Sequence, residues 1–531
     1  MNIKDIQLQA NVSELTAEIL KKRGLDTKEK LNKYLNPELD NLQSAKYIPD
    51  IHKVKRLVEE HIQWDNKIFI YGDYDVDGTS SSAIMAEALN KLGARYETVI
   101  SNRFVDGYGL SMTSANKMID KGASLVITVD CGISNHKEIE YLKDNGVDVI
   151  VIDHHEANEA PDTLFVDLKV KNGGYKFKEM CATGVTWKVG QYLTGEGLFE
   201  YIDIVALATI ADVVPLKDEN RIIVKHGLEK INNNPVSGIK ALKNIAELNN
   251  KKISSGHIGF QIAPRINAKG RLDTNKLSYE LLVEDDYNKA LKKAEILDKF
   301  NEKRKIMSER ALKDISEKVS KDDSIIIAQN DIGKGIVGLV AGDLKEKFEK
   351  PSIVFGKPDS KGVCKGSGRG FYPLHMKEAL DEAGHLLETW GGHAMAGGLS
   401  IKQENIEEFK KFMLDYTKDI KYKTIKYDLK ISIMDINKRF VKEINDIFAP
   451  VGAGNPSPKL FFDNRILKPD TTRTGEHLIF KIGNINGIGF GLGEEMWDIE
   501  EDDRIVGSVD FNEYRGRRNL QIKAKKIIKK S

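Results

Sequence analysis

Residues 68–81 read IFIYGDYDVDGTSS, a short apolar run followed by three alternating aspartates. β-rich apolar runs of the same kind recur at residues 96–100, 125–129 and 147–152, with helical patterns between them at 81–92, 111–120 and 135–145. Strands that alternate with helices of this length predict right-handed β-α-β units around a buried parallel sheet. The fold class indicated by this part of the chain is therefore α/β.

The regions around this sheet predict four further units. Residues 1–60 are polar and helix-leaning, so we expect a helical lead-in before a sheet domain at 61–275. Residues 271–332 contain neither Gly nor Pro, and 286–318 are rich in Lys, Glu, Leu and Ala, so we expect a connecting helix within 276–320. A second, smaller α/β domain follows at 321–421, with glycine clusters at 333–342, 366–370 and 391–398.

The C-terminal region, 422–531, changes to an all-β pattern after one helical stretch at 435–448. Short strand patterns occur at 459–467, 477–482, 488–492, 504–511 and 519–525. Five short strands in a region of this size predict an OB-like β-barrel.

Composition excludes several classes of protein. The 531 residues include 81 Lys plus Arg and 80 Asp plus Glu, with 40% hydrophobic residues, as expected for a globular chain of three or four domains. No apolar run approaches the ~18 residues of a membrane span, and the N-terminus has no signal-peptide pattern. The three cysteines lie far apart, which argues against structural zinc or a disulfide framework. We expect a cytoplasmic protein without a membrane partner.

The net charge of +1 conceals an uneven distribution. Residues 504–531 contain nine basic and two acidic residues, a net charge of +7, which leaves −6 on the rest of the chain. A basic tail on an OB-like barrel is typical of proteins that bind single-stranded nucleic acid.

Acidic and histidine clusters follow the predicted strands. Asp73, Asp75 and Asp77 follow the first strand, Asp130 follows the strand at 125–129, and the triplet 153–155 (Asp-His-His) follows the strand at 147–152. A further aspartate, Asp212, ends the apolar stretch 203–211. Carboxyl ends of parallel strands share one edge of a sheet, so three of these four clusters should converge there.

Such a concentration of negative charge requires cations. Two carboxylates 4 Å apart repel by about 4 kcal/mol at an effective dielectric constant near 20. Mixed carboxylate and imidazole ligands suit Mn²⁺ or Mg²⁺. A calcium-binding loop is the alternative for residues 73–84, but its twelfth position is Ile84 instead of a bidentate glutamate, and a strand precedes it instead of a helix.

Eight motifs in order resemble a known family. The segments YGDYDVDGTSS, VDCGIS, VIDHHE and ALATIADVVPL are similar to the four motifs of the DHH phosphoesterases. The segments NRFVDGYGLS, PRINAKGRL, GSGRG and GGHAMAGGLSI resemble the RecJ exonucleases within that family. The resemblance extends from the helical lead-in to the barrel. It implies a DHH-type parallel-sheet domain and a smaller DHH-associated α/β domain joined by a long helix, plus the OB-like barrel.

The resemblance also implies a hydrolase with two Mn²⁺ or Mg²⁺ ions. Asp130 is the expected bridge between the ions, and Asp73 is either a ligand or a carboxylate behind the ligands. His155 matches the histidine that faces the phosphate, so Asp130 and His155 are the residues expected to act in catalysis. The positions that match the metal ligands are Asp75, Asp77, Asp130, His154 and Asp212.

Other polar residues match positions that would contact the nucleic acid. Arginine binds phosphate oxygens with a bidentate fork, and glycine lets the backbone approach a phosphate closely. The expected contacts in the two α/β domains are Asn102, Arg103, Arg265, Asn267, Arg271, Ser367, Arg369 and His393. Those in the barrel are Arg515, Arg517 and Arg518, and candidates for base stacking are Tyr108, Phe371, Tyr372 and Trp390.

The function implied is a 5′-to-3′ exonuclease that hydrolyses single-stranded DNA to mononucleotides in DNA repair and recombination. A single-strand-binding protein or a helicase is a candidate partner, and we expect a monomer. Two alternatives stay open at this point. One is a phosphodiesterase for short oligonucleotides or cyclic dinucleotides, and the other is a non-catalytic replication scaffold.

Overall fold

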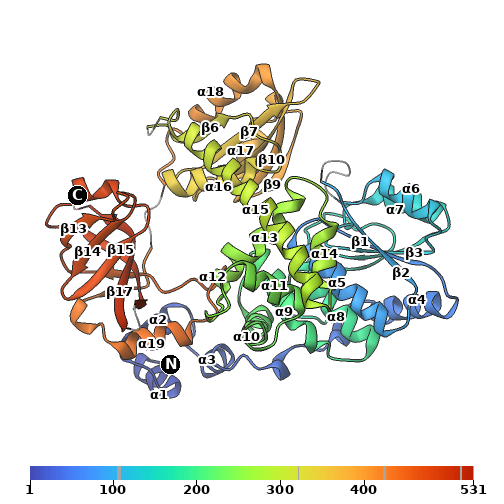
Figure 1. Ribbon diagram of the computed structural model, residues 1–531, viewed down its shortest axis with the longest axis horizontal. Helices are drawn as coiled ribbons and strands as arrows, with labels where there is room; N and C mark the ends of the chain where they lie inside the picture. Colours follow the sequence, from blue (N-terminus) through green and yellow to red (C-terminus); the bar gives the residue numbers. More distant parts are fainter. Residues whose placement is uncertain (104–108, 172, 321, 423–425, 515–516, 530–531) are drawn as a thin grey trace.

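The computed structural model describes residues 1–103, 109–171, 173–320, 322–422, 426–514 and 517–529. Figure 1 shows three lobes, which we call the first lobe (strands β1–β5), the second lobe (β6–β10) and the barrel lobe (β11–β17). The long helix α15 (Tyr287–Ser316) leads from the first lobe to the second. Among the described residues, no helix has the length and apolar character needed to span a membrane.

The first lobe is built on a five-stranded parallel sheet in the order β2-β1-β3-β4-β5. Alternate residues of β1 enter different cores, Ile68 and Ile70 on one face and Phe69 and Tyr71 on the other. Both faces of the sheet are therefore buried, as expected for parallel strands. The strand bounds are β1 (Ile68–Gly72), β2 (Tyr96–Ile100), β3 (Leu125–Val129), β4 (Asp148–Ile152) and β5 (Leu164–Val166).

The structure confirms the four predicted strands and adds β5, which has only three residues and no flanking pattern of its own. The helix predicted at 81–92 begins five residues earlier, at Val76. Asp75 explains this early start, because its side chain accepts a hydrogen bond from the Gly78 amide at 3.1 Å and caps the helix. The helices that cover the sheet include α5 (Val76–Lys91), α6 (Met112–Asp120), α7 (His136–Asp144), α8 (Ala182–Thr194) and α9 (Ile202–Ala211).

The predicted connecting helix is confirmed as α15, whose 30 residues span about 45 Å. It is preceded by α13 (Ala263–Gly270) and α14 (Lys276–Leu282). The second lobe contains a sheet in the order β6-β7-β8-β10-β9. Its glycine clusters fall at the start of α16 (Val337–Phe348), in β8 (Val363–Arg369) and in the hairpin of β9 (Thr389–His393) and β10 (Ala396–Lys402). The remaining strands are β6 (Ile326–Gln329) and β7 (Ser352–Pro358).

The barrel lobe contains a seven-stranded sheet in the order β11-β12-β16-β17-β15-β14-β13. The sequence predicted five strands, and the pattern at 459–467 combines the short β12 with the first residue of β13. The sequence missed β11. The bounds are β11 (Leu429–Ile431), β12 (Leu460–Phe462), β13 (Leu467–Thr471), β14 (Leu478–Ile482), β15 (Ile485–Gly489), β16 (Arg504–Tyr514) and β17 (Arg517–Ile528), with helix α19 (Lys438–Ile447).

The N-terminal helices complete the core of the barrel lobe. Ile6 and Leu20 pack in the same apolar cluster as Phe440 and Ile505. By contrast, α4 (Ile51–Gln63) packs against the first lobe. Residues 1–60 are thus divided between two lobes, because the apolar faces of α1 (Ile3–Ala10), α2 (Glu14–Lys22) and α3 (Lys28–Leu35) are buried on the C-terminal part of the chain. The division of the chain into the ranges given above stays a prediction.

Arg221 connects the first lobe to this composite barrel. It lies on α10 (Asp218–Asn233) and is only 4% exposed. Its Nε donates to the Tyr34 carbonyl oxygen at 3.1 Å, and one Nη donates to the Ile447 carbonyl oxygen at 2.9 Å. The guanidinium also lies 4.0 Å from the centroid of the Tyr34 ring. One side chain therefore holds α3 and α19 against the first lobe.

We expect Arg221→Met to destabilise this junction by about 2–3 kcal/mol, because two buried carbonyl groups lose a charged donor. Urea unfolding of the full chain measures the loss. The control is Lys225→Met on the same helix, which breaks an exposed pair with Glu38 (3.4 Å) and should cost less than about 1 kcal/mol. Equal losses for the two variants would show that Arg221 does not hold the junction.

Candidate metal centre and phosphate pocket

The predicted metal-ligand residues lie together at the carboxyl edge of the first sheet. The aspartates of the first motif follow β1, Asp130 follows β3, and the two histidines follow β4, while Asp212 caps the end of α9. The residues form three groups, and within each group the possible ligand atoms lie within 4.8 Å of one another. They are Asp73, Asp75 and Asp130; Asp77, His154 and Asp212; and Asp130, His154 and His155.

Close packing of the backbone and hydrogen bonds from neighbouring segments hold the first motif in place. Gly78 is required here because a Cβ atom would lie 2.4 Å from the Asp73 carbonyl oxygen. Asp73 accepts a hydrogen bond from the Ser101 hydroxyl at 2.8 Å. Asp77 accepts from the amides of Ala182 and Thr183, at 2.7 and 2.8 Å, at the start of α8. These two amides at the start of α8 therefore fix the position of the Asp77 carboxylate.

One residue of the centre and one directly beside it have a left-handed backbone conformation. Asp130 has φ 61°, and Val213, next to Asp212, has φ 60°. This left-handed region is unfavourable for a β-branched residue such as valine. Local strain of this kind persists where the surrounding structure imposes it, and it is concentrated at functional sites.

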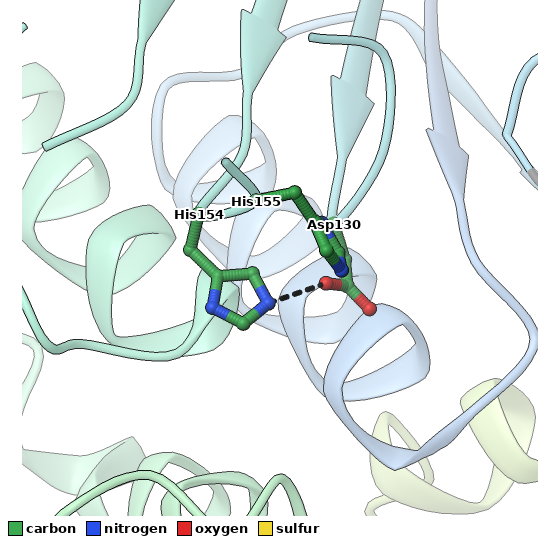
Figure 2. A group of neighbouring side chains, drawn as sticks. All are labelled: Asp130, His154 and His155. Carbon is green, nitrogen blue, oxygen red and sulfur yellow. Dashed lines mark ion pairs between the residues drawn. The ribbon is translucent and has the colours of Figure 1, made fainter. Parts of the chain in front are cut away.

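The two histidines have different environments (Figure 2). The Nε2 of His154 lies 3.3 Å from an oxygen of Asp130, and its Nδ1 lies 3.8 Å from an oxygen of Asp212. This Nδ1 is buried without a hydrogen-bond partner among the described residues. His155 instead contacts Asp153, whose Oδ1 lies 2.7 Å from Nδ1 of the ring. Asp153 thus orients His155, a role that the sequence analysis did not give it. The available signal was its position directly before the His-His pair.

Burial and mutual repulsion raise the carboxyl pKa values. Burial, together with the charge of Asp75, raises the pKa of Asp73 to about 7. Burial and then the neighbouring aspartates raise the pKa values of Asp130 and Asp212 well above the usual range. A bound cation would remove this cost, since carboxylates bind metals in their ionised form.

The histidines shift in opposite directions. Burial lowers the pKa of His154 to about 4, so its imidazole is neutral at pH 7, the form that binds metals. Burial also opposes the charged form of His155, but the hydrogen bond and charge of Asp153 outweigh it and raise that pKa to about 9. His155 is therefore a cation at neutral pH, beside the carboxylates.

These observations fit a centre for two hard divalent cations. The orphaned Nδ1 of His154 and the crowded carboxylates are both explained by a bound ion. Asp130 belongs to two of the three ligand groups, as the predicted bridge would. Carboxylate oxygen and neutral imidazole form a donor set suited to Mn²⁺ or Mg²⁺.

A cationic pocket of about 420 Å³, which we call the phosphate pocket, lies between the first and second lobes. Arg103 comes from the first lobe, and Lys334, Lys365, Ser367 and Arg369 come from the second. An Nη of Arg369 donates to the Ser367 hydroxyl at 2.9 Å. Among the described residues, four cations and no carboxylate line this pocket. Such a charge set suits a phosphate dianion.

A cluster of guanidinium groups adjoins this pocket. The Arg103 guanidinium lies 5.5 Å from the centroid of the ring of Tyr74, the residue between Asp73 and Asp75 in the sequence. Burial, and then the positive charges of Arg103 and Arg304, lower the pKa of Arg271 to about 10. Arg304, on α15, was missed by the sequence reasoning because a helical pattern does not show which face a basic residue takes. Neighbouring like charges of this kind indicate a binding site for an anion.

Some predicted contacts lie outside the phosphate pocket. Arg265 pairs with Asp298 at 2.8 Å, and the Asn267 side chain accepts from the Val76 amide at 3.0 Å. Arg265 thus binds α15, and Asn267 positions the start of α5. Asn102 directly precedes Arg103 without lining the pocket, and the exposed His393 lines a second pocket.

The barrel residues lie in the third lobe. Arg517 and Arg518 belong to β17, and the Arg518 guanidinium lies 3.9 Å from the centroid of the Phe511 ring. Arg515 and Tyr108 lie outside the described residues. The other stacking candidates differ in exposure. Tyr372 is 61% and Trp390 41% exposed, while Phe371 packs edge-on against Tyr422.

Several lysines of the basic tail form ion pairs with carboxylates of the same chain. Lys523 pairs with Asp510 at 2.6 Å, and Lys529 pairs with Asp503 at 3.0 Å. Lys526 pairs with Glu349, at the end of α16 in the second lobe. The net charge of the tail therefore overstates the charge that it can offer to a nucleic acid.

Comparison with known proteins gives three family-model matches along the chain. They are the DHH family N-terminal domain at residues 67–209, the DHHA1 domain at 322–419 and the RecJ OB domain at 427–526. The chain is 32% identical to the single-stranded-DNA-specific exonuclease RecJ of Bacillus subtilis, covering 98% of this chain and 69% of that protein. It is 31% identical to the protein of the same name in Haemophilus influenzae, covering 92% of each.

The whole chain is also similar to a solved structure. The crystal structure of RecJ from Thermus thermophilus in complex with Mn²⁺ matches with a TM-score of 0.84 at 26% identity, covering all of this chain and 78% of that chain.

Mn²⁺ affinity should fall as the pH is lowered. A protonated carboxyl must release its proton before it binds the ion, so affinity should drop about tenfold for each pH unit below about 7, the pKa of Asp73. Calorimetry in two buffers of different ionisation enthalpy counts the released protons. Asp73→Asn, which removes one titrating group, should flatten the dependence. Affinity that is constant between about pH 5.5 and 7.5 would contradict the raised carboxyl pKa values.

Proposed function

The chain belongs to the RecJ family of exonucleases, and on that premise we propose that it hydrolyses single-stranded DNA from the 5′ end and releases mononucleotides. The observation that supports this function best is the placement of the metal centre. The acidic centre lies at one edge of the first sheet, and the phosphate pocket lies where Arg103, from the same edge, meets the second lobe. A terminal phosphate carries two charges where an internal phosphodiester carries one. A pocket with four cations therefore favours the end of a strand.

The residues of the centre divide between two ions. Asp73 and Asp75 would hold one ion, Asp77, His154 and Asp212 would hold the other, and Asp130 would contact both. When bound, two Mn²⁺ or Mg²⁺ ions activate a water molecule and neutralise charge on the attacking and leaving oxygens.

Hydrolysis then breaks the P–O3′ bond of the first nucleotide. Water adds to the phosphorus, the first nucleotide leaves with a 3′-hydroxyl, and the remaining strand carries a new 5′-phosphate. His155 has its Nδ1 held by Asp153 and is cationic at neutral pH, so its Nε2–H can donate to an oxygen of the scissile phosphate. Asp153 is the group that keeps this ring oriented and protonated.

The barrel lobe would hold the strand away from the centre. The match to the RecJ OB domain supports a single-strand partner for this lobe. We extend the proposal to a monomer that acts in DNA repair and recombination in the cytoplasm, with a single-strand-binding protein or a helicase as its partner on the same DNA.

Asp130→Ala should lower hydrolysis by roughly 10³-fold or more, because it removes the carboxylate expected to contact both ions. Binding of single-stranded DNA should persist, since the barrel and the phosphate pocket are unchanged. Release of labelled nucleotides and fluorescence anisotropy measure the two properties. Asp144→Ala, an exposed change on α7, is the control. Full activity of the Asp130 variant would overturn the assignment of the centre.

Polarity can be tested with strands labelled at either end. The 5′ label should be released first as a mononucleotide, and a 5′-phosphate should be preferred over a 5′-hydroxyl. Arg369→Met should reduce that preference by about 10- to 100-fold, the value of a charge-assisted contact. Lys361→Met, an exposed change in the same lobe, should have no effect. Digestion from the 3′ end would refute the proposed polarity.

A further inference from the structure

A second pocket, of about 540 Å³, is lined by loops of the first lobe and by the end of β9 in the second. We call it the downstream pocket. Its first-lobe residues follow β3 (Ser134), β4 (Glu156 and Asn158) and β5 (Lys169), whereas Arg103 of the phosphate pocket follows β2. In the sheet order β2-β1-β3-β4-β5, the phosphate pocket is therefore at one end of the carboxyl edge and the downstream pocket at the other. Apart from Asp212, which ends α9, the candidate metal-ligand residues follow β1, β3 and β4, the strands that lie between β2 and β5.

One strand of the second lobe covers both pockets. Thr389 and Gly392 of β9 line the phosphate pocket, and Gly392 and His393 line the downstream pocket. Gly392 has φ 143°, and a Cβ atom there would lie 2.3 Å from the Ala396 carbonyl oxygen, so the hairpin requires glycine at this position. The two pockets thus form one path across the centre. Neighbouring strands are about 4.8 Å apart, so the path from β2 to β5 is about 19 Å long and can hold successive nucleotides.

The two pockets differ in charge. Among the residues that the structure describes, the phosphate pocket contains four cations, whereas the downstream pocket contains one lysine, one glutamate and the polar side chains of Ser134, Asn158 and His393. A nearly neutral pocket with many hydrogen-bonding groups does not suit a terminal phosphate dianion. It suits a nucleoside with a single-charged phosphodiester.

Lys169 is the cation of the downstream pocket. Among the described residues, no carboxylate lies within ion-pair distance of its ammonium group, although its backbone amide donates to Asp167 at 2.8 Å. Burial is the main cause of the raised pKa of Asp212 and of the lowered pKa of His154. The charge of Lys169 opposes the first shift and adds to the second, which places the ammonium within electrostatic reach of both residues.

We propose that the downstream pocket binds the nucleotide on the 3′ side of the scissile bond, and that Lys169 contacts the phosphodiester that follows this nucleotide. This inference rests on the proposed 5′-to-3′ hydrolysis. It assigns a specificity-determining role to Lys169 and makes His393 a contact for the same nucleotide. After each cleavage, the nucleotide in the downstream pocket carries the new 5′-phosphate, and it moves one position along the path to bring that phosphate into the phosphate pocket.

A neutral linkage in the substrate tests the contact directly. The probe is a 5′-phosphorylated single strand with a methylphosphonate between its second and third nucleotides. Wild-type enzyme should remove the first nucleotide about tenfold or more slowly than from the unmodified strand, because the linkage has lost the charge that the ammonium group binds. Lys169→Met should cleave both strands slowly and at the same rate, because the cation is absent in either case.

Three controls make the result specific. Lys171→Met alters the same loop but removes a lysine paired with Asp50 at 2.7 Å, and it should behave as wild type. A methylphosphonate placed far along the strand should not slow removal of the first nucleotide. Calorimetry with Mn²⁺ should give the same affinity for the Lys169 variant and for wild type, which separates a substrate contact from damage to the metal centre.

The inference would be wrong if the methylphosphonate slowed removal of the first nucleotide by the same factor in Lys169→Met as in wild type. His393→Ala provides a second variant at an exposed position, and an unchanged response to an abasic second nucleotide in that variant would also count against the pocket. Failure of the proposed function gives a different result, since a wild-type enzyme that digests from the 3′ end would release the other label first.

Discussion

Repulsion between buried carboxylates at one edge of a parallel sheet is the constraint on which the rest of this structure depends. At 4 Å a like-charged pair costs about 4 kcal/mol at an effective dielectric constant near 20, and burial adds to the cost. Burial first, and then this repulsion, raises the pKa values of Asp73, Asp130 and Asp212. The protein maintains the arrangement with hydrogen-bond donors, which are the backbone amides at the start of α8 for Asp77 and the Ser101 hydroxyl for Asp73. Cations complete it.

The opposite charges are contributed mainly by the second lobe. Lys334, Lys365 and Arg369 face Arg103 across the lobe boundary, so the acidic centre and the cationic pocket lie on one path. Lys334 also donates to the Arg103 carbonyl oxygen at 3.0 Å, and Arg271 donates to the Gly335 carbonyl oxygen at 3.2 Å. A near-zero net charge is the sum of these separated regions, and it conveys little about either.

The two ends of the chain meet in the barrel lobe. The first three helices cover an apolar face of the C-terminal sheet, and Arg221 ties both to the first lobe. The pairing of Lys526 with Glu349 connects the barrel to the second lobe as well. Each lobe is consequently in contact with the other two, which limits how far one can move without breaking buried or charged contacts.

Much of this organisation is predictable from local sequence. The spacing of hydrophobic residues and the turn residues predicted the strands β1 to β4 and the long helix α15, because hydrophobic patterning and helix propensity act over short distances. The clustering of the candidate metal-ligand residues was also predictable, since residues that follow parallel strands share one edge of the sheet. The contacts of Arg265 with Asp298 and of Asn267 with Val76 could not be predicted in this way. Whether a basic or amide side chain contacts substrate or protein depends on the segments that pack against it.

The sequence alone therefore determined the fold class and the chemistry of the centre, through residue types and their positions relative to strands. Only the tertiary structure decided which cations are available, because Lys523 and Lys529 pair with carboxylates in or beside the β16–β17 hairpin and Lys526 pairs with Glu349 of the second lobe. It also decided that two pockets flank the centre, since each is formed by the close approach of β9 to loops that follow different strands of the first sheet. Contacts between distant segments are set by packing, and no local pattern encodes them.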